Sequence, residues 1–110
     1  MRAWFFTETA YPYLPPADTY PSIRVSLPNR EYDPVEGAAI YDRYLKECQI
    51  ADEEGMEIML NEHHQTATCM SSACVITLAV LSRITKRARL LVLGYPIGHR
   101  PDPLRGAGHR

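Results

Sequence analysis

A helix with clear start and stop signals lies near the middle of the chain. Asp33 is a residue type that caps helix N-termini, Pro34 suits the first helical position, and Glu36 stands where a capping box places a carboxylate. Gly55 follows the last periodic residue, as C-terminal caps do. This pattern predicts a helix over residues 34–54. Its apolar positions recur at helical spacing: Val35, Ala38, Tyr41, Leu45, Cys48 and Ala51.

Three short apolar segments flank this helix and a second helical segment. Residues 2–7 and 89–94 are apolar at successive positions, which is typical of strands covered on both faces of a sheet. Residues 56–60 form the third candidate strand. The order strand–helix–strand–helix–strand predicts an α/β fold with a parallel sheet and crossover helices.

The second helix is expected over residues 71–87. Nearly all of its first half is apolar, and its β-branched residues also fit a buried strand, but its length favours a helix. Ser71 or Ser72 would cap its N-terminus, and basic residues in its last turns suit a helix C-terminus. We therefore expect a helix that is buried over most of its circumference.

A segment rich in tyrosine and proline, residues 8–34, follows the first strand. It holds six of the nine prolines and four of the seven tyrosines, and it fits no helix or strand pattern. Such long irregular connections are uncommon in compact domains unless they are functional or disordered. The tyrosines argue against disorder, because segments that cannot pack have few aromatic residues.

The size and charge of the chain exclude several classes of protein. With 110 residues it forms at most one domain. A formal net charge of -1 provides no basic field for nucleic acid, and no apolar stretch approaches the length of a membrane span. Three cysteines form an odd set in a chain without an export signal, which favours a reduced, cytoplasmic protein.

Polar residues with catalytic potential follow the ends of the expected strands. Parallel strands place their carboxyl ends at one edge of a sheet, where α/β proteins bind ligands. Glu62, His63 and His64 close the second strand; Glu62 is suited to orient one imidazole, and adjacent histidines on a strand point to opposite faces. The alternative is an ordinary hydrogen-bonded pair of loop histidines. Further polar or permissive positions at the same edge are Asn61, Gly94, Tyr95 and Pro96.

A metal site is a weaker interpretation of the same region. Glu62, the two histidines, Cys69 and Cys74 are ligand types within 13 residues, but their spacing matches no zinc motif. Free cysteines are usually buried core residues. The sequence also lacks the glycine-rich phosphate loops and a serine on a nucleophile elbow. We therefore expect no metal.

Three sequence stretches closely resemble the luciferase-like flavin-dependent monooxygenases. They are the helix DPVEGAAIYDRYLKECQIADEEGMEI, the strand ending NEHHQT, and the segment RLLVLGYPIGHRPDPLR. The Glu-His-His ending is the most specific of these matches. The resemblance covers about residues 1–105, which would be the N-terminal third of a (β/α)8 barrel of the TIM type.

The resemblance implies a flavin-dependent oxidoreductase that uses reduced FMN, or a deazaflavin coenzyme, with O2 and a small organic substrate. Glu62, His63 and His64 would be the catalytic residues, and the first histidine of the pair is the one that the family match places beside the flavin. Asn61, Gly94, Tyr95 and Pro96 would line the cofactor site, and the Tyr/Pro segment would help to cover the substrate. A flavin reductase and a dimeric partner subunit are compatible with the family.

The last residues depart from this family. Residues 106–110 read GAGHR, where the family continues with a helix, so we expect an aberrant tail from a truncation or a frameshift. A complete barrel takes about 250 residues, and three strands cannot close one. We therefore expect this chain by itself to be inactive. The alternative function is a non-catalytic interaction fragment that docks on an intact paralogue.

Overall fold

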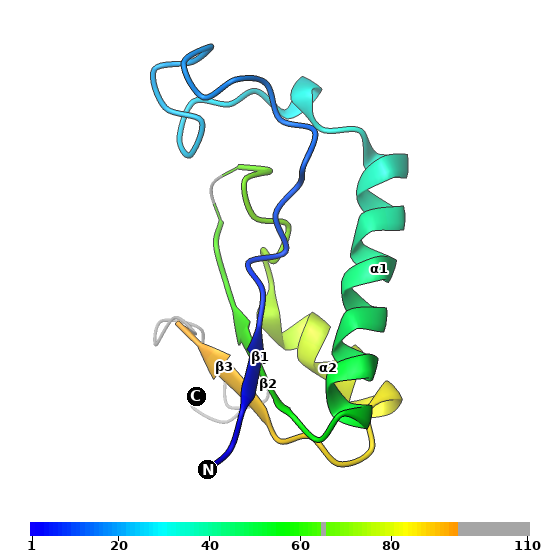
Figure 1. The fold of residues 1–110 in the computed structure, drawn as a ribbon. Helices are drawn as coiled ribbons and strands as arrows, with labels where there is room; N and C mark the ends of the chain where they lie inside the picture. The colour runs from blue at the N-terminus through cyan, green and yellow to red at the C-terminus, as the bar shows by residue number, and fades with distance from the viewer. Residues whose placement is uncertain (65, 95–110) are drawn as a thin grey trace, which may run out of the picture.

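Two helices pack on one face of a three-stranded parallel sheet in the computed structural model, which describes residues 1–64 and 66–94 (Figure 1). The strands pair in parallel, as the alternation of elements predicts, and their order is β1-β2-β3. The elements are β1 (Trp4–Phe6), a 3-10 turn (Asn29–Glu31), α1 (Pro34–Glu53), β2 (Glu57–Asn61), α2 (Cys74–Ile84) and β3 (Leu90–Leu93).

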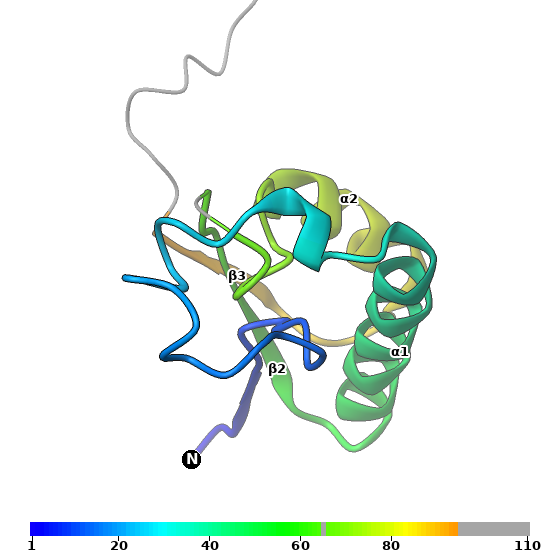
Figure 2. The same cartoon turned by 90° about the horizontal axis from the view of Figure 1, so that it is seen from above.

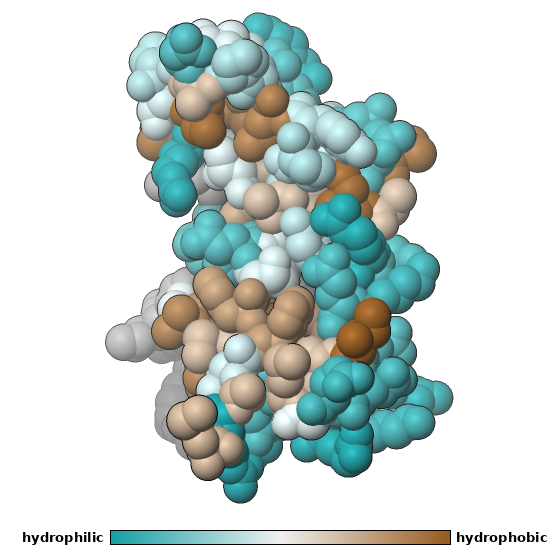
Figure 3. Space-filling model, viewed as in Figure 1, coloured by the Kyte–Doolittle hydropathy of each residue, from teal (hydrophilic) through white to brown (hydrophobic). Residues whose placement is uncertain are grey.

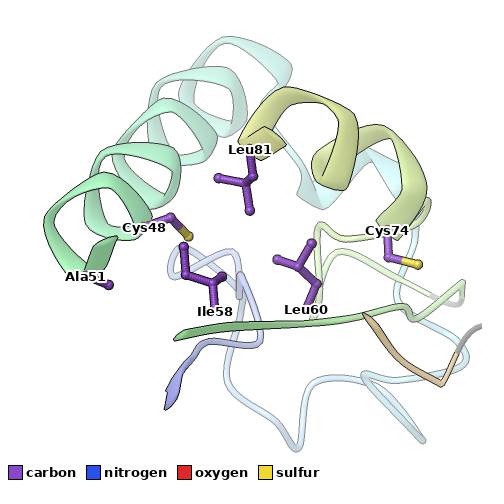
Figure 4. Packing of buried hydrophobic residues seen from close by; sticks show 6 residues of the cluster. All are labelled: Cys48, Ala51, Ile58, Leu60, Cys74 and Leu81. Atoms are coloured by element: carbon purple, nitrogen blue, oxygen red, sulfur yellow. The ribbon is translucent and has the colours of Figure 1, made fainter. Parts of the chain in front are cut away.

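The core lies between the sheet and the two helices. In the parallel register Ile58 of β2 pairs with Phe5 of β1 and with Leu90 of β3, so these side chains share one face. Figure 2 shows both helices on that side of the sheet. The buried cluster draws on both helices and on β2 (Figure 4), and its members are Cys48, Ala51, Ile58, Leu60, Cys74 and Leu81.

The opposite face of the sheet is exposed, which corrects the expectation of strands covered on both faces. Trp4 and Phe6 of β1 are 39% and 44% exposed, and Leu91 and Leu93 of β3 are 42% and 51% exposed. Apolar side chains gather over the strands in the lower half of Figure 3. Over residues 1–64 and 66–94, both helices lie on the other face, so the outer residues of β1 and β3 have no covering layer.

The predicted N-cap of α1 and its C-terminal glycine are confirmed, but the capping box is not, because the backbone N–H of Asp33 donates to the Tyr11 hydroxyl instead of to Glu36. Asp33 accepts hydrogen bonds from the backbone N–H groups of Val35 and Glu36, and Gly55 adopts a φ of 79° just beyond the helix. The prediction of a buried apolar face is wrong for the first turns of α1, because Val35 and Ala38, which were expected on that face, are exposed.

Gly37 and Ile40 are the buried residues of those first turns. A Cβ atom at Gly37 would overlap the ring of Tyr32, which packs directly against the helix there. The first turns of α1 therefore face the Tyr/Pro segment, and only its later turns face the sheet. The spacing of apolar residues predicts a single buried face along the whole helix. It cannot reveal that the first turns pack against a different segment from the later turns.

Helix α2 is shorter and more exposed than predicted. It begins at Cys74 rather than at Ser71 and ends at Ile84, and the side chain of its N-cap residue, Ala73, makes no capping bond. The hydroxyl of Ser71 instead donates to the carbonyl of Asn61, 2.7 Å away. Burial over most of the circumference is also wrong. Only the face that meets the sheet is buried, and the exposed side includes Val75, Ile76 and Val80.

The Tyr/Pro segment is ordered by hydrogen bonds from its tyrosines and to its backbone. The buried Tyr11 hydroxyl accepts from the backbone N–H of Asp33 at 3.3 Å, and the Tyr11 ring contacts the ring of Tyr32. Tyr20 donates to Glu31 at 2.7 Å, and Tyr44 of α1 donates to a carbonyl of the segment at 3.0 Å. Figure 1 places the segment beyond the carboxyl ends of the strands. This arrangement agrees with the argument against disorder.

Two buried carboxylates hold the amino edge of the sheet. Asp52, near the end of α1, accepts from the backbone N–H groups of three successive residues before β3: Lys86 at 2.7 Å, Arg87 at 2.9 Å and Ala88 at 2.6 Å. Glu57 of β2 accepts from the backbone and side chain of Arg89 and from the side chain of Arg2. These bonds tie α1, β2 and the start of β3 together.

In the part of the chain that the structure describes, neither helix is both long and apolar enough to cross a membrane.

Candidate functional site

The carboxyl edge of the sheet brings together most of the predicted site residues. Strand β2 ends at Asn61, which pairs with Leu93 of β3. Glu62, His63 and His64 follow β2, and Gly94 follows β3 with a φ of 83°. The parallel register therefore places Gly94 next to the Glu-His-His ending, as predicted from the strand order.

Asn61 is a buried polar residue whose side chain has no hydrogen-bond partner in the part of the chain that the structure describes. The residue is 5% exposed, and neither Oδ1 nor Nδ2 finds a partner among the described residues. Because Leu60 faces the helices, alternation along β2 turns Asn61 to the other face of the sheet. A buried amide without partners costs about 1–3 kcal/mol, and such groups are rare away from functional positions.

The carboxylate of Glu62 contacts two parts of the site. Oε2 accepts from the backbone N–H of Cys74 at the start of α2 at 2.9 Å, and Oε1 lies 2.5 Å from Nε2 of His64. The Glu62 side chain is only 3% exposed. Hydrogen bonds from the Cys74 thiol and backbone N–H, together with His64, lower the pKa of Glu62 to about 2. Glu62 is therefore ionised at neutral pH.

His63 and His64 both line a pocket of about 290 Å³, here called the histidine pocket. The prediction that they point to opposite faces is therefore wrong, because β2 ends at Asn61 and strand alternation does not extend to the histidines. The prediction that Glu62 orients one imidazole is realised at His64. The backbone N–H of His63 donates to the carbonyl of Ser71 at 3.0 Å. The lining comes from the loop after β2 and from the Tyr/Pro segment, and it consists of Asn29, Tyr32, His63, His64, Thr66, Ala67, Cys69, Met70 and Ser72.

Hydrogen bonds join the two walls of the histidine pocket. Thr66 donates through its hydroxyl to the carbonyl of Ile23 at 2.8 Å, and the backbone N–H of Met70 donates to the carbonyl of Thr9 at 2.9 Å. Thr9 adopts a φ of 49°, a conformation that non-glycine residues seldom take, and is held by these neighbours. The Tyr/Pro segment thus forms one wall of the pocket.

Asn29, Tyr32 and Met70 were not predicted as site residues. The first two lie more than 30 residues from the histidines in sequence, and their spacing carries no motif. The unusual composition of the Tyr/Pro segment was the only available signal. It indicated a functional loop but did not identify the contacting residues.

The three cysteines are buried and unpaired. Burial raises the pKa of the Cys48 thiol to about 11, and burial together with the Glu62 carboxylate raises that of Cys74 to about 11. These two thiols are therefore protonated at neutral pH and unsuited to act as nucleophiles. Among the described side chains, no group of three or more histidine, cysteine, aspartate or glutamate residues is arranged to hold a metal ion.

Some predicted positions lie outside the described residues. These are Tyr95 and Pro96 of the cofactor site and the tail at residues 106–110.

No protein-family model matches the sequence, and the comparisons with curated proteins and with solved structures find no significant match.

Proposed function

We propose that this chain is the N-terminal part of a luciferase-like, flavin-dependent oxidoreductase whose strands belong to a (β/α)8 barrel. The supporting observation is that His63 and His64 line a pocket at the carboxyl edge of a parallel sheet, directly after the buried Asn61, whose amide has no partner among the described residues. This is the edge at which such barrels carry their active sites. The proposal includes a cytoplasmic location.

The side chain of Asn61 fits the polar edge of a flavin. A primary amide offers one acceptor and two donor hydrogens, and here neither atom is engaged within the described residues. The pyrimidine ring of a flavin presents an N–H group between two carbonyls, which an amide can bind by donating and accepting. Deazaflavins carry the same edge, so both cofactors remain in the proposal.

Gly94 suits the same role because of its small size. A Cβ atom built there meets no described residue within 4 Å, which supports the approach of a ligand to the backbone at the end of β3. His63 and His64 would hold or move a proton at the histidine pocket, since an imidazole can do both near neutral pH. The pocket would admit a small organic substrate between the histidines and the Tyr/Pro segment.

A bound reduced flavin would supply the electrons with which O2 is reduced while the organic substrate is oxygenated. A flavin reductase and a second subunit are the protein partners of the proposal. We expect the 110-residue chain by itself to bind flavin weakly and to be inactive. Among the described residues that line the histidine pocket there is no lysine or arginine to bind a phosphate.

An anaerobic titration of the full chain tests this proposal. Reduced FMN and reduced riboflavin are added while the fluorescence of Trp4 and the tyrosines is followed. Both should bind with similar affinity, weaker than micromolar, because no lysine or arginine among the described lining residues is available to bind the phosphate. Asn61→Leu should weaken both by about 10-fold, which corresponds to about 1.4 kcal/mol.

Gln49→Leu is the matched control, because it removes an amide from α1, away from the pocket lining. It should leave both affinities unchanged. The proposal is contradicted if no flavin or deazaflavin saturates the signal, or if Asn61→Leu binds as well as the wild type.

The exposed apolar face of β1 and β3 favours a second candidate, the interaction fragment that docks on an intact paralogue. In that case the histidine pocket has no cofactor to bind. The same titration separates the candidates, since the second predicts no saturable change with either flavin.

A further inference from the structure

Glu62 links the start of α2 to the histidine pocket. The N-cap residue of α2, Ala73, has no side chain able to accept from the first backbone N–H groups of the helix. Oε2 of Glu62, 12 residues earlier in the chain, accepts from the first of them at Cys74. A carboxylate at this position is also favoured by the positive end of the helix dipole. The helix therefore fixes the orientation of the Glu62 carboxylate.

The second oxygen of this carboxylate determines which nitrogen of His64 carries a proton. An ionised carboxylate only accepts hydrogen bonds, so Nε2 of His64 must be the donor in the 2.5 Å contact. When the ring is neutral, Nδ1 is then the basic nitrogen. The His64 side chain is 50% exposed and lines the histidine pocket, where a ligand could reach it.

His63 lacks such support. Its backbone N–H is bonded to Ser71, but no described side chain accepts from or donates to its ring. A ring without a partner can change its tautomer and rotate between orientations. Proton transfer needs a fixed donor and acceptor geometry, which favours the histidine that is held in place.

We propose that Glu62 is a positioning residue, anchored on α2, that holds His64 as the Nε2–H tautomer, and that His64 rather than His63 exchanges a proton with the ligand of the histidine pocket. The positioning of His64 stands on the contacts alone, whereas the ligand rests on the proposed function. Glu62 itself does not transfer the proton, because both of its oxygens are engaged. This assignment differs from the resemblance, which favours the first histidine of the pair.

Imidazole ¹⁵N–¹H correlation spectra of the full, ¹⁵N-labelled chain test the tautomer. At a pH where the ring is neutral, His64 should give the Nε2–H pattern, and His63 should show averaged nitrogen shifts. His63→Gln and His64→Gln assign the signals. Wild-type protein alone can overturn the proposal, which fails if neutral His64 is mainly the Nδ1–H tautomer or an even mixture.

Glu62→Gln sharpens the test. Its amide oxygen can still accept from the Cys74 N–H, which directs its NH2 group towards His64. Nε2 would then have to accept, so His64 should switch to the Nδ1–H tautomer while the amide of Cys74 stays protected from hydrogen exchange. Glu31→Gln, which removes a carboxylate that binds Tyr20 instead, should leave the His64 pattern unchanged. An unchanged tautomer in Glu62→Gln contradicts the proposal.

The flavin titration of His63→Gln and His64→Gln tests the second part separately. Flavin binding should weaken in His64→Gln and stay unchanged in His63→Gln, and the reverse result would overturn the assignment. If no flavin binds but the tautomer results hold, the proposed function fails and the positioning of His64 by Glu62 stands. If flavin binds and the tautomer results fail, only the positioning role is lost.

Discussion

The two edges of the sheet use buried polar groups in different ways. At the amino edge, Asp52 and Glu57 have several donors each, all supplied by the chain within 3.0 Å. At the carboxyl edge, the amide of Asn61 has no partner within residues 1–64 and 66–94, and Glu62 bonds to a half-exposed histidine beside a pocket. The carboxylates of the amino edge are satisfied by the chain itself, whereas the amide of Asn61 at the carboxyl edge is not satisfied by any described residue, which we propose leaves it for a ligand. This division is typical of parallel α/β proteins.

The largest effect is expected at the amino edge, from Asp52→Ala. Three successive backbone N–H groups would lose their acceptor, and partly buried donors without partners are costly. We expect the midpoint of thermal unfolding to fall by roughly 10 °C, measured by circular dichroism.

Asp42→Ala is the matched control for this substitution. Asp42 lies on the same helix, but its side chain is 61% exposed and its ion pair with Lys46 is at the surface. The midpoint of thermal unfolding of Asp42→Ala should differ from that of the wild type by at most about 2 °C. Equal effects of the two substitutions would show that Asp52 does not hold the amino edge.

At the carboxyl edge, Asn61→Leu is expected to stabilise the protein, whereas Asp52→Ala at the amino edge should destabilise it. Leucine has a similar volume and removes two unsatisfied polar atoms from a buried position, so unfolding should require about 1–3 kcal/mol more. Urea denaturation measures the change. Asn29→Leu, at an exposed position, should stay within about 0.5 kcal/mol of the wild type. Destabilisation by Asn61→Leu would mean that the amide is satisfied in solution.

Acid should weaken both edges. The backbone N–H of Lys86 lowers the pKa of Asp52, that of Arg89 lowers the pKa of Glu57, and the Cys74 thiol does most to lower that of Glu62. A lowered pKa in the folded state means that the ionised carboxylate favours folding. The contribution of Glu62 is therefore complete above about pH 4.5 and is lost as the pH falls towards about 2.

Urea midpoints between pH 6 and pH 2 check this dependence. Glu62→Gln cannot titrate at this position, so it should lose less stability than the wild type between pH 4.5 and pH 2. Parallel acid profiles for the two proteins would show that Glu62 is not held as an ionised carboxylate.

The smallest effect concerns cysteine reactivity. With pKa values of about 11 against an ordinary value of 9.0, Cys48 and Cys74 should react with iodoacetamide about 100-fold more slowly than a free thiol at pH 8. Glu62→Gln should accelerate Cys74 several-fold and leave Cys48 unchanged, as followed by mass spectrometry. Equal acceleration at both positions would indicate general loosening of the fold.

Much of the fold could be predicted because its signals are local. The caps of α1, the three strands and their parallel order depend on neighbouring residues and short periods. The strand was expected at residues 56–60, whereas β2 covers residues 57–61, so it begins and ends one residue later. This shift makes Asn61 the last residue of the strand and turns its amide away from the helices.

The errors occur where the partner of a segment lies far away in sequence. Ser71 and Ser72 are suitable caps for α2 by residue type, but the carboxylate of Glu62 occupies that position in space. The exposed faces of α2, β1 and β3 have the composition of buried ones, so only the arrangement of the layers shows which face is covered.

By itself, the sequence determined the alternation of strands and helices, and therefore the edge at which Glu62, His63 and His64 had to lie. Those outcomes follow from hydrophobic period, helix caps and chain direction, which act over a few residues. Only the tertiary structure decided that Glu62 holds His64, that Asn61 has no partner among the described residues, and that the Tyr/Pro segment forms a wall of the pocket. Each depends on distances of a few ångströms between elements, which residue spacing does not encode.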